Sequence, residues 1–177
     1  MLCLICLWGC GVPKEPPKEN KKETSQQNEN AEQLYLILEH DREQQKLKLY
    51  AYEDGNEYEY TYADVTLFKD KYDKITTSED FSTGKIVTIA NGDNLGYLLE
   101  VRSSPDVWKY ENVTRFSIEK EKGIFTIADT KYAIDYQTML FSNGTLMEWE
   151  DISENDTLTV FGEGKKILSV IVTKGQG

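Results

Sequence analysis

The chain has 177 residues, of which 39% are hydrophobic and 29% are charged, a composition typical of a globular protein with one medium domain or two small ones. Its formal net charge is −11, and all but one of these net charges lie from Leu34 onward. This excess disfavours nucleic-acid partners and anionic lipid headgroups, because both would be repelled. Cations, peptides, glycans and basic proteins are compatible partners.

The amino terminus is an uncharged apolar run from Met1 to Cys10. It is too short to cross a membrane, which takes about 20 apolar residues, but it has the length of the apolar centre of a secretory signal peptide. Its last four residues, Leu7-Trp8-Gly9-Cys10, resemble the lipobox of bacterial lipoproteins. In that family the cysteine receives a diacylglyceryl group and a peptidase then cuts the chain before it.

The lipobox resemblance implies that residues 1–9 are the remnant of a signal peptide and that Cys10 is the lipidation site. The protein would then be held on the extracytoplasmic face of the cell membrane. Trp8 departs from the pattern, which usually has a small residue there, and no Lys or Arg precedes the run. The missing basic residue suggests that translation starts upstream of Met1. The alternative, a buried amino-terminal strand, fits poorly with the polar stretch that follows.

Two further cysteines, Cys3 and Cys6, form a C-x-x-C inside this apolar run. Such a pair elsewhere indicates redox chemistry or a metal site, but no second pair accompanies it here. Cleavage before Cys10 would remove both. We therefore expect a mature protein without disulfides or a thiolate metal site. No other motif in the sequence indicates a metal or a cofactor, and we expect neither.

Residues 10–33 are expected to form a disordered linker behind the lipid anchor. The segment is dominated by Pro, Lys, Glu, Gln and Asn and holds three of the chain's four prolines. It cannot bury enough apolar surface to offset the loss of chain entropy, and its prolines favour an extended spacer.

From Leu34 the sequence alternates with period two, which predicts strands. Lys46–Tyr52 alternates strictly, and Glu57–Tyr62 alternates glutamate or threonine with tyrosine, which predicts three tyrosines on one face. Similar runs recur as far as Val101. A boundary is expected at Ser103-Ser104-Pro105-Asp106, where the proline could open one helical turn.

The second half follows the same plan up to the final run Ile167–Val172, and no stretch has ten residues of helical periodicity. A shift of 71 residues places Thr88-Ile89 on Thr159-Val160 and Phe68 near Phe141. Chance β periodicity is the alternative explanation for this match. We predict an all-β protein with two tandem small β-barrel or β-roll units, residues 34–103 and 113–175, packed together after the linker.

The runs Val113–Ile118, Gly123–Ile127 and Ile167–Gly175 resemble, in pattern and order, the amino-terminal region of Gram-positive surface lipoproteins that carry a PEGA domain. In that group two such β units precede the PEGA domain, a small β module associated with cell surfaces. The chain stops at Gly177 without it, through truncation or because this member lacks it. The resemblance implies an envelope location and a non-enzymatic role, and it supplies no catalytic residues.

No catalytic constellation stands out. His40 is the single histidine, and its charged neighbours predict a solvent-exposed hairpin turn. The acidic segments Asp54–Glu57, Asn91–Asn94 and Asp151–Asp156 lack the spacing of calcium loops and are typical of hairpin turns. Paired carboxylates for glycoside hydrolysis stay open as an alternative, because acidic residues crowd the body.

Three aromatic residues, Trp108, Tyr110 and Trp149, are candidates for a ligand-stacking face, with burial in a β core as the alternative. The sequence thus predicts a non-catalytic envelope lipoprotein that acts as a surface interaction, assembly or spacing module. The two alternatives are a cell-wall glycan-binding module and a wall-glycan hydrolase that uses paired carboxylates. The expected partners are the membrane, through the lipid anchor, and wall glycan or other envelope proteins.

Overall fold

The computed structural model describes residues 33–91 and 96–175, and these residues belong to one compact unit. The expected signal segment, Cys10 and residues 11–32 of the expected linker lie outside the described residues. The all-β prediction is confirmed: the described part of the chain consists of strands in two sheets and three single 3-10 turns, Ser78–Asp80, Lys120–Lys122 and Trp149–Asp151. Within it, no helix has the length and apolar character needed to cross a membrane.

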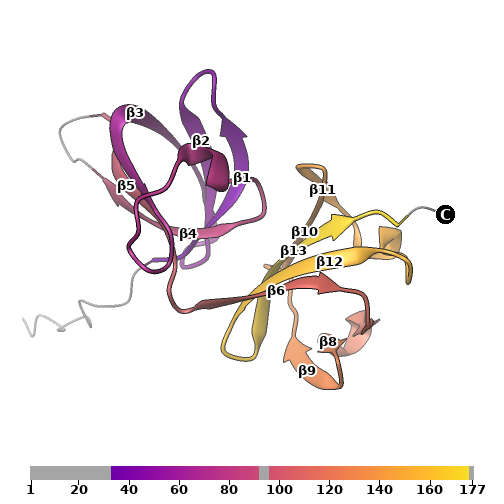
Figure 1. Cartoon of the computed structure of the whole chain (residues 1–177). Coiled ribbons are helices and arrows are strands. Elements are labelled where there is room, and N and C mark those ends of the chain that lie inside the picture. Colours follow the sequence, from indigo (N-terminus) through magenta and orange to yellow (C-terminus); the bar gives the residue numbers. More distant parts are fainter. Residues whose placement is uncertain (1–32, 92–95, 176–177) are drawn as a thin grey trace, which may run out of the picture. The chain divides into compact units, whose positions relative to one another are not determined.

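The first sheet is formed by the indigo to magenta strands of Figure 1. These are β1 (Tyr35–Asp41), β2 (Lys46–Ala51), β3 (Glu57–Lys69), β4 (Ile86–Asn91) and β5 (Leu98–Ser103). They pair in the order β1-β2-β3-β5-β4, and β1 also pairs with β4 through Tyr35↔Val87 and Leu36↔Ile86. The five strands therefore close into a small barrel.

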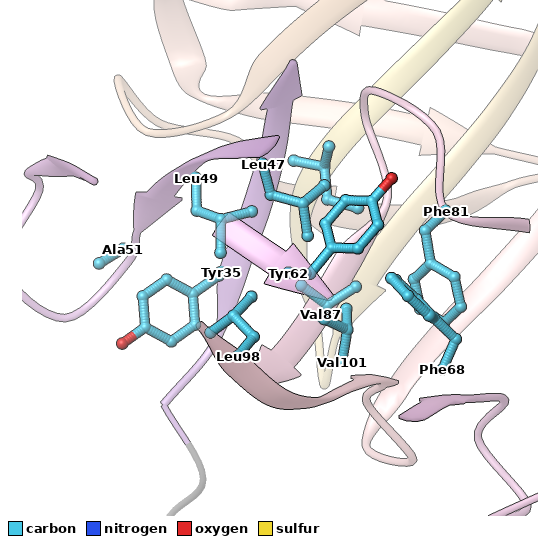
Figure 2. Packing of buried hydrophobic residues seen from close by; sticks show 11 residues of the cluster. Tyr35, Leu47, Leu49, Ala51, Tyr62, Phe68, Phe81, Val87, Leu98 and Val101 are labelled. Carbon is cyan, nitrogen blue, oxygen red and sulfur yellow. The ribbon is translucent and has the colours of Figure 1, made fainter. Parts of the chain in front are cut away.

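Side-chain alternation explains which face of this barrel is buried. On β2, Leu47 and Leu49 are fully buried, while Lys48 between them points outward and pairs with Glu57 of β3. Figure 2 shows the apolar side chains converging on one core, with Phe68 and Phe81 packed together. The three tyrosines of β3 do not share one environment, because Tyr62 is buried and Tyr58 is exposed at the start of the strand.

The second sheet has eight strands. They are β6 (Val107–Val113), β7 (Phe116–Glu119), β8 (Ile124–Ile127), β9 (Thr130–Ala133), β10 (Met139–Ser142), β11 (Thr145–Met147), β12 (Thr157–Glu163) and β13 (Lys166–Thr173). The hairpin of β12 and β13, yellow in Figure 1, lies between β6 on one side and β9 and β10 on the other.

This second sheet is not a closed barrel, and of the two forms predicted for each unit, β-barrel or β-roll, the closed barrel describes the first sheet alone. In the first sheet β1 pairs with both β2 and β4. In the second sheet no single strand joins the two ends in this way. Strand β6 pairs with β12, β7 pairs with β8, and a break at Thr114-Arg115 separates β6 from β7. The sheet is therefore open at that break.

The two sheets pack against each other, as the sequence predicts. A shared apolar cluster joins Leu36, Tyr50 and Ile86 of the first sheet to Phe141, Phe161 and Leu168 of the second. Two hydrogen bonds cross the same boundary: the Tyr52 hydroxyl donates to the Leu168 carbonyl at 2.9 Å, and the buried Ser169 hydroxyl donates to the Gly84 carbonyl at 2.6 Å.

The segment between the sheets contains no helical turn. Pro105 and Asp106 form a short link, and β6 begins at once, with Val107 paired to Glu163 of β12. That pairing extends the backbone directly after the proline and leaves no residues for a helix. Strand β6 also begins the second sheet at Val107, ahead of the predicted start at residue 113.

Candidate ligand-binding groove

Three aromatic rings gather on one side of the second sheet. Trp108 and Tyr110 are two residues apart on β6 and therefore share a face, and Tyr132 of β9 lies against both. The ring centroid of Trp108 is 4.9 Å from those of Tyr110 and Tyr132. The hydroxyls of the two tyrosines are 3.1 Å apart and hydrogen-bonded. This bond and burial raise the pKa of Tyr132 to about 12, so its hydroxyl stays protonated at neutral pH.

The indole of Trp108 is held in place by contacts with β12 and with the turn that follows it. Its Nε1 donates to the Gly164 carbonyl at 3.0 Å, and its ring lies over Gly162. A Cβ atom at position 162 would lie 2.1 Å from Cζ2 of the indole, so only glycine allows this close approach. Trp108 thus acts as a rigid support on which the half-exposed Tyr110 ring rests.

A groove of about 420 Å³ opens beside these rings, lined by residues 110–115 and by Ile127, Ala128, Thr130 and Tyr132. A β-bulge shapes one wall: two residues of β6, Glu111 and Asn112, oppose Thr159 of β12, and Asn112 takes a φ of 56°. Bulges re-aim side chains and are common beside functional sites. The two-residue turn Ala128-Asp129 forms the opposite wall.

The polar groups of the groove are a mixed set. Arg115 has no ion-pair partner among the described residues, whereas the Glu111 carboxylate pairs with Lys109. Thr114 and Thr130 add hydroxyls, and Asn112 adds an amide. Apolar ring surface with a few hydrogen-bonding groups, in a volume of a few hundred Å³, is typical of small-ligand sites.

The structure brings together two of the three aromatic residues singled out from the sequence. Trp108 packs against Tyr110, which lines the groove, but it does not itself line the groove. Trp149 lies elsewhere, on the turn before Ile152, where its ring centroid is 6.2 Å from that of Phe125. Both tryptophans pack against the second core. The sequence did not single out Tyr132 as a site residue. Strand alternation places Tyr132 on the inner face of β9, but it does not predict that β9 lies close to β6.

His40 does not lie in a solvent-exposed turn. It belongs to strand β1 and is half-buried, with Nδ1 2.5 Å from the Phe81 carbonyl and Nε2 2.8 Å from the Tyr62 hydroxyl. In the neutral ring Nδ1 donates to the carbonyl and Nε2 accepts from the phenol. Burial lowers the pKa of His40. The sequence pattern failed because the alternation of β1 carries this polar ring inward, where it holds the loop that contains Phe81.

The acidic turns are occupied by local hydrogen bonds. The Asp54 carboxylate accepts from the Asn56 amide at 2.9 Å and from the Tyr58 hydroxyl. Asp156 is buried and accepts from the amides of Ser153 and Gly175 and from Lys174. The third segment, Asn91–Asn94, falls largely outside the described residues. Among those that are described, no group of three or more His, Cys, Asp or Glu side chains is placed to hold a metal ion.

Comparison with known proteins adds no relative. No family model, no curated protein and no solved structure matches the chain. The class that the geometry supports is an all-β protein of two packed sheets with an aromatic groove on the second. The resemblance to PEGA-type surface lipoproteins stays a prediction.

Proposed function

We propose that this chain is a non-catalytic, lipid-anchored module of the bacterial cell envelope that binds a saccharide in the groove beside Tyr110. The observation that carries the proposal is the Tyr110 ring, exposed on the groove side and held from behind by Trp108 and Tyr132. An aromatic face of this kind packs against the C–H face of a pyranose ring, while the sugar hydroxyls bond to nearby polar groups.

The polar groups of the groove suit that ligand. Arg115 and Asn112 offer donors, and the hydroxyls of Thr114 and Thr130 can donate or accept. A saccharide needs such bonds because burying its hydroxyls without partners is costly. The anchor at Cys10 and the linker of residues 10–33 would hold the groove at the envelope, within reach of wall glycan.

Assembly or spacing at the cell surface is the second candidate, favoured by the open edge of β6. The strand pairs only with β12 among the described strands. Its other edge could therefore accept a strand from a protein partner. The β-bulge at Asn112 counts against this, since bulges twist an edge strand away from regular pairing.

The hydrolase alternative would need two carboxylates across a cleft. The groove beside Tyr110 holds one, Glu111, already paired with Lys109. Glu39, Asp41 and Glu59 do gather in a depression of about 170 Å³ on the first sheet. That depression also contains Lys46, which pairs with Glu59 at 2.9 Å. Glu59 is therefore a poor candidate for a general acid, whose pKa must be raised, because an ion pair favours the charged form of its carboxyl group.

The test compares the full chain with Tyr110→Ala in cosedimentation with purified cell-wall glycan. We expect the wild type to be retained and the variant to bind about tenfold more weakly. An anchoring aromatic contact contributes about 1.4 kcal/mol or more to the binding free energy, which corresponds to a tenfold change in Kd. Tyr136→Ala is the matched control, since Tyr136 is 91% exposed and lies outside the groove. Its affinity should equal that of the wild type.

Equal retention of both variants, or no retention of the wild type, would overturn the saccharide groove. Release of reducing ends from the same material, abolished by Glu39→Gln or Glu59→Gln, would favour the hydrolase instead. Crosslinking of the unretained protein to another envelope protein would favour assembly.

A further inference from the structure

A second hollow, of about 240 Å³, lies where the turn after β3 meets strands β4, β5, β6 and β12. Its walls include three lysines, Lys71, Lys85 and Lys109, and the rings of Tyr72 and Phe161. We call it the lysine pocket. Three ammonium groups around one hollow are unexpected in a chain with a net charge of −11, in which the lysines of β2 are each paired with a glutamate of β3.

The carboxylates near the pocket do not neutralise all three ammonium groups. Lys109 pairs with Glu111, but no carboxylate lies within ion-pair distance of Lys71 or Lys85 among the described residues. Asp70 also lines the hollow, and its Oδ1 is taken by the main-chain amides of Tyr72 at 2.8 Å and Lys74 at 3.0 Å. Lys85 donates to the main-chain oxygen of Asp80 rather than to its carboxylate.

Of the three lysines, Lys85 is partly buried, whereas Lys71 and Lys109 are exposed. Burial, and then the charge of Lys109, lower the pKa of Lys85. The Lys109 ammonium also lies 5.9 Å above the Phe161 ring, and that of Lys71 lies 5.2 Å from the Tyr72 ring. A bound anion would offset both the lost hydration of Lys85 and its repulsion by Lys109.

A hydroxyl completes the wall. Ser104 is 4% exposed and lines the hollow. A serine hydroxyl can donate a hydrogen bond to an acceptor bound in the hollow. The apolar residues Ile86 and Val107 lie beside it and strengthen any charge interaction by excluding water.

We propose that the lysine pocket is an anion site that binds a phosphate group, with Lys71, Lys85 and Lys109 supplying positive charge and Ser104 a hydrogen bond. Lysine acts on phosphate as a point charge and needs no planar bidentate geometry, unlike arginine. The proposal does not depend on the saccharide groove, because the two sites share no residue. A phosphodiester of an envelope polymer and free inorganic phosphate have the same chemistry, and the test separates them.

The test follows the lysine side-chain signals of the full chain by NMR during titration with inorganic phosphate, and in a second arm with dimethyl phosphate. Sodium chloride at matched ionic strength is the reference. We expect the signals of Lys71, Lys85 and Lys109 to move together with saturation, and the pKa of Lys85 to rise when phosphate binds. Saturation by dimethyl phosphate would identify a diester as the ligand, and saturation by inorganic phosphate alone would identify the free ion.

Lys71→Gln is the first variant, because Lys71 has no hydrogen bond or ion pair among the described residues and its loss should leave the fold intact. It should weaken phosphate binding about tenfold, and Ser104→Ala should weaken it to a smaller degree. Lys131→Gln, which removes one exposed charge outside the pocket, should change nothing. Signals that move equally with chloride, or equal effects of Lys71→Gln and Lys131→Gln, would overturn the site.

Discussion

Thr66 and Thr138 hold the same position in the two sheets. The Thr66 hydroxyl accepts from the Ala63 amide at 2.9 Å and donates to the Leu98 carbonyl at 2.6 Å. The Thr138 hydroxyl accepts from the Asp135 amide at 3.1 Å and donates to the Ile167 carbonyl at 3.0 Å. Each threonine is buried and ties the residues just before it to the start of the neighbouring parallel strand.

This equivalence predicts matched effects of mutation. Thr66→Val and Thr138→Val each keep the side-chain shape but leave a buried amide and carbonyl unpaired, so each should lower the free energy of unfolding by about 1–3 kcal/mol. Thr145→Val, at an exposed position, is the control and should change stability little. Urea denaturation measures all three. A large loss for one threonine and none for the other would contradict the structural repeat.

The repeat also shows how far the sequence could predict the fold. The 71-residue shift is right for β4 and β12, since Ile89 pairs with Val101 as Val160 pairs with Val170. That correspondence places Val101 on Val170, whereas the 71-residue shift places it on Val172. The difference of two residues arises because the turn between β12 and β13 is shorter than the turn between β4 and β5. Period-two patterns tolerate a slip of two residues without changing face, so the sequence could not detect it.

The broken strand β6–β7 and the groove beside it were beyond prediction for a different reason. They depend on the break at Thr114-Arg115 and on the αL turn at Ala128-Asp129, which meet only after long-range pairing. Aromatic content alone could select Trp108, Tyr110 and Trp149 as candidates, but it could not show that Tyr110 lines the groove and that both tryptophans pack against the core.

His40 predicts a component of acid sensitivity. Its pKa in the folded chain is lowered from 6.5 by burial, so as the pH falls below 6.5 the unfolded chain takes up a proton before the folded chain does. The free energy of unfolding should therefore decrease between pH 6.5 and about 5, above the range in which most carboxylates titrate.

His40→Gln provides the test, because Gln can donate to the Phe81 carbonyl and accept from Tyr62 without titrating. Since His40 is the single histidine of the chain, the variant should show a flat stability profile in this pH window. Urea midpoints measured at intervals across the window compare the two proteins. An identical slope in both would show that His40 is not responsible.

Lipidation at Cys10 is a prediction from the sequence alone. The mature protein should begin at Cys10 and carry thioether-linked acyl chains, whose membrane anchoring contributes about 0.8 kcal/mol per buried methylene. Cys10→Ala should release the body into the medium or leave the chain unprocessed. Cys6→Ala, inside the expected signal segment, should be processed normally. Intact-mass measurement decides the matter, and an uncleaved, lipid-free wild-type chain would rule out the anchor.

The turn at Ala128-Asp129 predicts a stabilising substitution at the groove. Both residues have positive φ, 44° and 68°, as a two-residue type I′ hairpin turn requires. Asp tolerates this left-handed backbone conformation. The conformation costs alanine roughly 1–2 kcal/mol of strain energy and costs glycine very little. Because glycine also loses more entropy on folding, we expect Ala128→Gly to raise the free energy of unfolding by a net of about 0.5–1 kcal/mol.

The converse substitution is the control for this turn. Gly144 has a φ of 77°, and a Cβ atom added there would have no neighbour within 4 Å, so Gly144→Ala adds the same backbone strain without a steric clash. It should lower stability by about 0.5–1 kcal/mol, opposite in sign to Ala128→Gly. Because Ala128 lines the groove, its glycine variant should also be assayed for glycan retention. Increased stability with weaker retention would mean that the strained turn holds the groove in its binding shape, and decreased stability would refute the strain.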